Sequence, residues 1–279
     1  MAQGGELDQV LDLETIELDL FRGHTPGRSG PRIFGGQVVA QALTAAYRTV
    51  EGRLCHSLHS YFIRAGDPKI PILYKVERAR DGASFTTRRV IAIQRGRQIF
   101  NLSASFQIPE PGFEHQSAMP DAPGPDGLLN EEQLHALEPQ PGDEARQPWP
   151  IEMRSIDPGP RRPVGPREPT FRCWFRARED MGDDVAVNQC VLAYASDMSL
   201  MDSSVRPYAI DWNDPKFQGA SLDHAIWFHR PCRFNEWHLY VQDSPSASGA
   251  RGFNRGEIYS QDGVLVASAT QEALIRYRN

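Results

Sequence analysis

Three polar residues in the second half of the chain lie in otherwise apolar surroundings. Asp197 follows a helical stripe, Ser221 begins an apolar strand-like run, and Gln271 shares the face of another run with Leu265 and Ala267. A polar side chain in such a position loses free energy unless it finds a hydrogen-bond partner. A carboxylate can accept a proton, and a hydroxyl and an amide can hold a small molecule. The three residues are therefore candidates for one catalytic site, although each could also be a satisfied buried polar group.

Other catalytic and metal-binding patterns do not fit this sequence. It contains no GxSxG nucleophile elbow, no P-loop and no GxGxxG fingerprint. His56 and His59 are three residues apart and His224 and His229 are five apart, so on a strand each pair points to opposite faces. We therefore expect neither a metal site nor a cofactor. His59 is an alternative catalytic residue, and the competing interpretation is a buried strand histidine with a hydrogen-bond partner.

Two regular segments must position these residues, and each is a helix followed by several strands. Apolar residues at helical spacing define the helices. These stripes are Val39, Leu43, Ala46 and Val50 in the first segment and Val187, Val191, Tyr194 and Met198 in the second. The strand-like runs are 57–64, 71–80, 84–95 and 98–107, and then 221–230, 236–244, 250–260 and 264–275.

The two segments read as diverged copies of one unit. The sequence YFIR (61–64) resembles WFHR (227–230), and SAS (103–105) resembles SAT (268–270). Local alignment places the counterparts of Asp197, Ser221 and Gln271 near Thr44, Cys55 and Phe106. The first copy would then lack the acid and the amide. This asymmetry predicts one working site and one that has lost its function.

A sheet that follows a single helix can bury one face only against that helix. The pattern therefore predicts an α+β protein with the tandem double hotdog fold, in which each unit is a long antiparallel sheet wrapped around a central helix. Pairing the two sheets edge to edge would protect their edges. Another helix-on-antiparallel-sheet fold is the alternative.

The segment between the copies is rich in proline. Fourteen of the 22 prolines lie between residues 109 and 169. Because proline cannot donate to a sheet and disfavours helix before it, we expect a long surface connection with one short helix near residues 131–137. The predicted units are an N-terminal hotdog at 1–110, the connection at 111–169 and a C-terminal hotdog at 170–279.

Composition narrows the class of protein. The chain has 279 residues, 40% of them hydrophobic, and a net charge of -6, which argues against nucleic acid as a partner but allows a small anionic ligand. Its four cysteines are widely spaced, which favours reduced, unpaired thiols. The sequence shows neither a secretory signal nor an apolar run long enough to span a membrane. We expect a cytoplasmic enzyme or binding protein.

Nearly the whole chain resembles the type II acyl-CoA thioesterases, the TesB-like family. The motifs that carry the resemblance are FGGQVVAQAL (34–43), LHSYFIRAGDP (58–68), RDGASF (80–85), LDHAIWFHRP (222–231) and ARGFNRGE (250–257), followed by DG (262–263) and QE (271–272). The resemblance implies a double hotdog that hydrolyses acyl-CoA to a free fatty acid and CoA. It implies that Asp197, Ser221 and Gln271 are the catalytic residues, with serine where many relatives have threonine. A homo-oligomer is a further expectation from the family.

The residue types fit this reaction. A thiolate is a good leaving group, so the harder step is the delivery of water to the carbonyl carbon. Asp197 would accept the proton of that water, and Ser221 and Gln271 would hold it. An acyl-CoA hydratase on the same fold and a non-catalytic acyl-CoA-binding protein are the alternatives. The acyl tail would lie near Trp227 and Tyr194. The candidates for binding the CoA phosphates are Arg88, Arg89, Arg161, Arg162, Arg251 and Arg255.

Overall fold

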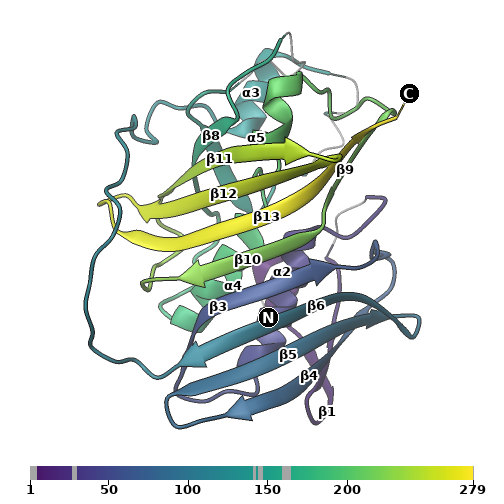
Figure 1. Cartoon of the computed structure of the whole chain (residues 1–279), viewed down its shortest axis with the longest axis vertical. Coiled ribbons are helices and arrows are strands. Elements are labelled where there is room, and N and C mark those ends of the chain that lie inside the picture. Colours follow the sequence, from purple (N-terminus) through teal and green to yellow (C-terminus); the bar gives the residue numbers. More distant parts are fainter. Residues whose placement is uncertain (1–4, 27–29, 141–142, 144–146, 159–164, 279) are drawn as a thin grey trace.

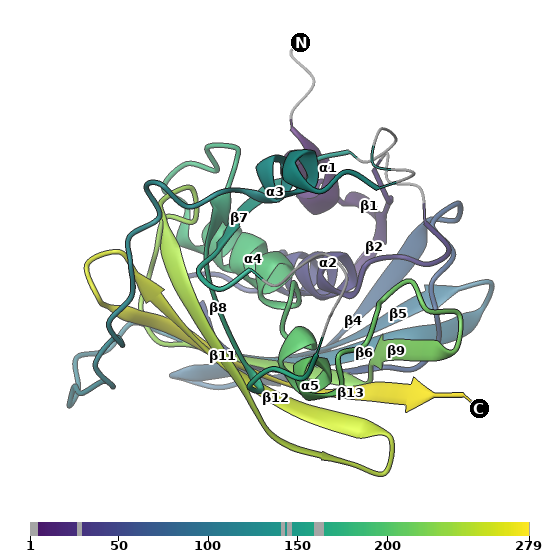
Figure 2. The same ribbon diagram turned by 90° about the horizontal axis from the view of Figure 1, so that it is seen from above.

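Two buried helices form the centre of the molecule. A computed structural model describes residues 5–26, 30–140, 143, 147–158 and 165–278. Helices α2 (Gly35–Tyr47) and α4 (Val185–Ser196) lie inside the curve of one large sheet, as Figure 2 shows from above. Ten residues of α2 and nine of α4 are buried, and a helix with so much buried surface must be enclosed by other elements.

One antiparallel sheet runs through both halves of the molecule. Its order is β1-β2-β4-β5-β6-β3-β10-β13-β12-β11-β8-β7, and β9 also pairs with β13. The first-half strands are β1 (Glu14–Glu17), β2 (Leu20–Gly23), β3 (Leu54–Phe62), β4 (Ile72–Asp81), β5 (Phe85–Gln94) and β6 (Arg97–Gln107). The second-half strands are β7 (Ile151–Ser155), β8 (Thr170–Ala177), β9 (Phe217–Ser221), β10 (Asp223–Phe228), β11 (His238–Ser248), β12 (Arg251–Ser260) and β13 (Leu265–Tyr277).

The two halves of the sheet meet where β3 pairs with β10, near the middle of Figure 1. Tyr61 lies opposite Asp223, and Ser57 lies opposite Trp227. Adding 166 to the residue number converts Ser57 to Asp223 and Tyr61 to Trp227. The same offset therefore exchanges the two ends of the strand pair, so the pairing is symmetric about its centre. Each half contributes one strand to this seam and one helix beneath it.

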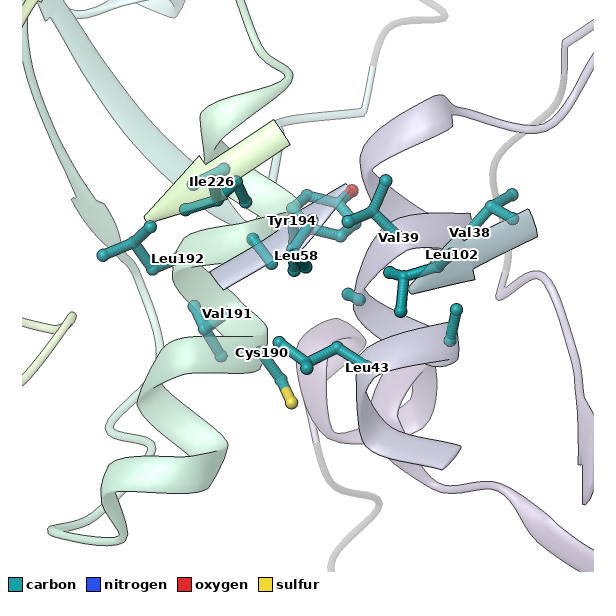
Figure 3. Close-up of a cluster of buried hydrophobic side chains, with 14 of the residues drawn as sticks. Val38, Val39, Leu43, Leu58, Leu102, Cys190, Val191, Leu192, Tyr194 and Ile226 are labelled. Atoms are coloured by element: carbon teal, nitrogen blue, oxygen red, sulfur yellow. The ribbon is translucent and has the colours of Figure 1, made fainter. Parts of the chain in front are cut away.

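Apolar side chains from both halves pack in one continuous core. Figure 3 shows Leu43 of α2 and Val191 of α4 facing each other below Leu58 of β3 and Ile226 of β10. All four residues are completely buried, and Leu58 and Ile226 come from opposite sides of the seam. Burial of this kind contributes about 25 cal/mol per Å² of apolar surface, so the core holds the two helices against the sheet.

Both predicted helices and all the predicted strand runs are present. The run predicted at 221–230 is divided at Leu222 into β9 and β10. The structure adds elements that were not predicted, namely α1 (Glu6–Leu11), β1, β2, β8, α5 (Asp202–Val205) and the short 3-10 helix η2 (Arg206–Tyr208). The four cysteines are free, as expected.

The proline-rich connection is less irregular than the sequence suggested. Its short helix is confirmed as α3 (Glu131–Leu137), but it also contains β7, which pairs with β8 at the end of the sheet. Figure 1 shows the chain after β6 running past the ends of the second-half strands before it reaches α3. None of the described helices has both the length and the apolar character needed to cross a membrane.

Candidate active site

Asp197 lies where the end of one central helix meets the start of the other. It is the residue after α4, and its Oδ2 accepts a hydrogen bond of 2.8 Å from the backbone N–H of Gly36 in the first turn of α2. The first N–H groups of a helix have no partner within that helix, and they carry the positive end of its dipole. α2 has no side-chain cap of its own, so the carboxylate of Asp197 takes that place.

Two glycines make this close approach possible. A Cβ atom at Gly35 would lie 2.6 Å from Asp197 Oδ2, and one at Gly36 would lie 2.2 Å from the carbonyl oxygen of Tyr194. Neither distance is compatible with a side chain, because nonbonded heavy atoms do not approach that closely. The Gly35–Gly36 pair in the FGGQVVAQAL motif therefore lets the helix backbone reach the carboxylate.

Ser221 and Gln271 converge on the other oxygen of the same carboxylate. Ser221 Oγ donates to Asp197 Oδ1 at 3.3 Å, and Gln271 Nε2 donates to the same atom at 2.5 Å. Gln271 Nε2 also lies 3.0 Å from Ser221 Oγ. The structure thus brings together all three residues that the sequence singled out, from the end of α4, the end of β9 and the middle of β13.

Gln271 is fully buried, as its position in the alternating pattern of β13 predicts. Asp197 and Ser221 are half-buried and line a cavity of about 1290 Å³, so Gln271 reaches them from behind. A carboxylate with one face on a cavity and hydrogen-bond donors on the other sides can accept a proton from a molecule in that cavity.

His224 is a fourth residue of this cluster, and sequence reasoning considered it only as a metal ligand. It is fully buried on β10, with its Nδ1 3.4 Å from Gln271 Nε2 and its Nε2 2.8 Å from Ser196 Oγ. Burial lowers the pKa of His224, and the nearby carboxylate of Asp197 opposes this shift only in part. The signal that could have identified it is a histidine among apolar residues on the inward-facing side of the motif LDHAIWFHRP.

Aromatic side chains form much of the cavity wall. Phe34 makes edge-to-face contacts with Trp149, at 5.2 Å between ring centroids, and with Tyr194, at 5.1 Å. Val38 and Phe62 extend the apolar surface, and residues of α3 also line the cavity. Tyr194 was predicted here, whereas Phe34 and Trp149 were not. Trp149 belongs to the proline-rich connection, whose place in the fold the sequence did not reveal.

The arginines that were predicted for the CoA phosphates do not line this cavity in the described part of the chain. Arg88 is almost fully buried and donates to Thr49 and to the carboxylate of Asp81 at 2.6 Å, so it has a structural role. Three others form surface ion pairs: Arg89 with Glu77, Arg251 with Glu272 and Arg255 with Asp243. Arg161 and Arg162 lie outside the described residues. Of the arginines that the structure describes, Arg32 and Arg64 line the cavity.

His59 and Trp227 lie on the outer face of the sheet. His59 is exposed, and its ring packs edge-to-face on Trp227 at 5.1 Å between centroids. The interpretation of His59 as a buried histidine is therefore wrong, and Trp227 does not line the cavity as predicted. The strand alternation explains both results, because Leu58 and Ser60 take the inward positions beside His59. Among the described residues there is no cluster of three side chains placed to hold a metal ion.

Comparison with known protein families matches both halves of the chain. Residues 25–107 match a model described as the acyl-CoA thioesterase N-terminal domain, and residues 149–274 match one described as acyl-CoA thioesterase. Human acyl-coenzyme A thioesterase 8 is 42% identical over 283 residues, which cover 96% of this chain and 88% of that protein.

Solved structures support the same grouping. The acyl-CoA thioesterase II TesB2 from Mycobacterium marinum superposes with a TM-score of 0.81 at 40% identity, covering 98% of this chain and 99% of that one. A protein of unknown function with a hot dog fold from Alicyclobacillus acidocaldarius gives 0.77 at 20% identity, covering 99% and 100%. The hotdog fold expected from the sequence is thereby confirmed.

Proposed function

Because the chain belongs to the acyl-CoA thioesterase family, we propose that it hydrolyses acyl-CoA with a water molecule held by Asp197, Ser221 and Gln271. The observation that carries this proposal is the convergence of the Ser221 hydroxyl and the Gln271 amide on one carboxylate oxygen of Asp197. The carboxylate faces a cavity with aromatic walls, which suits an acyl chain.

In the proposed reaction the water oxygen attacks the carbonyl carbon of the thioester while Asp197 accepts a proton from the water. The tetrahedral intermediate then collapses, the carbon–sulfur bond breaks, and the CoA thiolate leaves. Asp197 returns the proton, so the products are a free fatty acid and CoA. General-base assistance of this kind contributes roughly 10²- to 10⁴-fold in rate.

The residues around Asp197 support its role as the base. Gly36 N–H holds Oδ2, while Ser221 and Gln271 hold Oδ1, so the carboxylate has a fixed orientation. Ser221 Oγ can accept a hydrogen bond from Gln271 as it donates one to Asp197, which fixes the direction of its proton. A group held in this way loses little entropy when the water and the thioester are brought together.

The substrate would use the cavity along its length. The acyl chain would pack against Phe34, Trp149 and Tyr194, whose rings contact one another. Among the described residues, Arg32 and Arg64 are the arginines that line the cavity and could reach the phosphates of CoA. Their side chains donate to backbone carbonyls, Arg32 to Gly219 at 2.8 Å and Arg64 to Gln98 at 2.6 Å, and these contacts hold the charged groups at the cavity.

We further infer that the chain consists of two hotdog units, with the second beginning at β7. The symmetric pairing at the β3–β10 seam and the presence of one buried helix beneath each half support this arrangement. With the 166-residue offset, Ser221 corresponds to Cys55 in the first unit. The residue after α2 is Arg48, where Asp197 follows α4. The first unit would thus lack the acid.

A thiol-trapping assay over a series of acyl-CoA chain lengths tests the proposed reaction. We expect stoichiometric release of CoA thiol and free fatty acid, with a preference that reveals the acyl length the cavity accepts. A hydratase would alter the acyl chain without releasing thiol, and a binding protein would do neither. Either of these results would overturn the proposal.

A further inference from the structure

We propose that His224 is a positioning residue, which holds the Gln271 amide so that its N–H groups face Asp197 and Ser221. This inference rests on the proposed function, because it concerns how the same site is kept in order. His224 is fully buried, does not line the cavity, and its ring hydrogen-bonds to the cluster at Gln271. It would therefore act on catalysis through the amide and not on the substrate.

The hydrogen bonds fix the protonation state of the His224 ring. The hydroxyl of Ser196 donates to the carbonyl oxygen of Ala193 at 3.1 Å, so its Oγ accepts from His224 Nε2 and the ring proton lies on Nε2. Nδ1 of the neutral ring is then bare and can accept from Gln271 Nε2 at 3.4 Å. The two hydrogens of Gln271 Nε2 face three acceptors, Asp197 Oδ1, Ser221 Oγ and His224 Nδ1, so the contact with His224 is a shared hydrogen bond.

The orientation of the amide is what these hydrogen bonds control. Gln271 could place either its nitrogen or its Oε1 toward Asp197, because the two ends of an amide have almost the same shape. The bare Nδ1 of His224 attracts N–H and repels oxygen, so it favours the same orientation that serves Asp197 and Ser221. Gln271 Oε1 is buried and has no hydrogen-bond partner within the described residues, so no other contact of that oxygen fixes the amide.

The first half of the sheet provides a natural comparison. The 166-residue offset relates His224 to Leu58, and Leu58 lies opposite Ala104 on β6. On the second half, extending the β10–β13 register by one residue places His224 opposite Gln271. All four residues are almost completely buried. In the first half, which lacks a counterpart of the Asp197 carboxylate, leucine and alanine thus fill the positions of His224 and Gln271. A histidine is not required for packing at this point of the fold.

The test is a double-mutant cycle between His224 and Gln271, measured as kcat and KM on a thiol-trapping assay. His224→Leu copies the side chain of the first half, so we expect the unfolding midpoint to change little. Loss of one hydrogen bond in this setting should lower kcat about 5- to 10-fold with KM almost unchanged. In a Gln271→Ala background, His224→Leu should change kcat by less than about twofold, because the group it positions is gone.

Two further variants complete the experiment. His224→Asn offers its Oδ1 as an acceptor near the position of Nδ1, so kcat should return to within about threefold of the wild type. His229→Leu is the matched control, because His229 follows the same strand but is exposed, and its ring bonds to Ser268 on the outer face. That control should keep its full activity.

The outcomes separate this inference from the proposed function. If Gln271→Ala retains full activity, the proposed catalytic site itself is wrong. If Gln271→Ala is slow but His224→Leu is not, only the positioning role is wrong. An equal loss from His224→Leu in both backgrounds, or a His224→Asn enzyme as slow as His224→Leu, would show that the ring serves packing alone.

Discussion

The carboxylate of Asp197 caps a helix to which it does not belong. Its Oδ2 accepts the N–H of Gly36 at 2.8 Å, so the residue that ends α4 also satisfies the start of α2. Such a contact places a side-chain acceptor at the positive end of a helix dipole, where the first backbone N–H groups of α2 have no partner within the helix. The same bond couples the geometry of the proposed base to the packing of the two central helices.

Replacement of Asp197 by asparagine should remove the proton acceptor while keeping the size of the side chain. We expect kcat to fall by about 10³-fold with a normal circular dichroism spectrum, because general-base assistance is lost. Asp243→Asn is a suitable control, since Asp243 is paired with Arg255 on the surface. Full activity of Asp197→Asn would contradict the assignment.

The contribution of Ser221 to kcat should come from its hydroxyl group and not from the size of its side chain. Ser221→Thr keeps the donor to Asp197 Oδ1 and should be nearly silent, because the residue is half-buried at the end of β9 beside the cavity. Ser221→Ala removes the hydroxyl and should lower kcat about tenfold. Steady-state kinetics of the two variants side by side distinguish these effects, and a large loss from Ser221→Thr would mean that the role of the hydroxyl is misassigned.

Addition of one methyl group at Gly35 should displace the carboxylate. The new Cβ atom would meet Asp197 Oδ2 at 2.6 Å and Phe62 Cζ at 3.0 Å. We expect Gly35→Ala to lower kcat by about 10- to 100-fold, since small misplacements of a catalytic group are costly. Gly112→Ala, where nothing lies within 4 Å of the new Cβ, should leave kcat unchanged. Equal kinetics for both variants would argue against tight placement of Asp197.

Arg32 and Arg64 should recognise the nucleotide part of the substrate. Arg32→Ala or Arg64→Ala should raise KM for acyl-CoA roughly tenfold, because a charged hydrogen bond to phosphate is lost. The same variants should show little change with acyl-N-acetylcysteamine, which carries no phosphate. Arg89→Ala provides the surface control. A similar rise in KM with both substrates would show that the arginines maintain the structure of the cavity and do not bind the phosphates of CoA.

His238 should make the stability of the fold depend on pH. It is buried against Phe234, and burial lowers its pKa from 6.5 to about 4. Between these values the unfolded chain binds a proton that the folded chain does not, so stability is complete above about pH 6.5 and falls as the pH drops towards 4. This loss amounts to about 3 kcal/mol.

Urea unfolding of the wild type and of His238→Phe at pH 7 and pH 4 measures this contribution. The variant keeps an aromatic ring against Phe234 but cannot titrate, so its stability should change about 3 kcal/mol less between the two pH values. An identical pH dependence in the two proteins would show that His238 is not responsible.

Long helices and strands with a clear periodicity were predictable from the sequence. Short elements were not, and neither was a strand that directly follows the proline-rich segment. The stripes beginning at Val39 and Val187 predicted α2 and α4 because a buried helix must show apolar residues at this spacing. Strand β1 has four residues that are all exposed, so it carries no alternation to detect. Strand β8 does alternate, with Phe171, Cys173 and Phe175 inward, but it directly follows the proline-rich segment.

The candidate site was predictable as a set of residue types but not as a geometry. Asp197, Ser221 and Gln271 stood out because they are polar in apolar surroundings, and they do meet. The arginines could not be placed in this way, because charge alone does not reveal position. Arg88 is buried beside Thr49, whereas Arg32 and Arg64 lie at the cavity without any distinctive local pattern.

The bond between Gly36 and Asp197 joins the first half of the chain to the second, because Gly36 begins α2 and Asp197 follows α4. The proposed site therefore draws on both halves, and the covalent link between the halves ensures that two unlike halves are always present in equal number. An assembly of identical subunits would duplicate every substitution on both sides of its axis. In the proposed two-unit arrangement each half can change independently, so the second unit can keep catalytic residues that the first unit has lost.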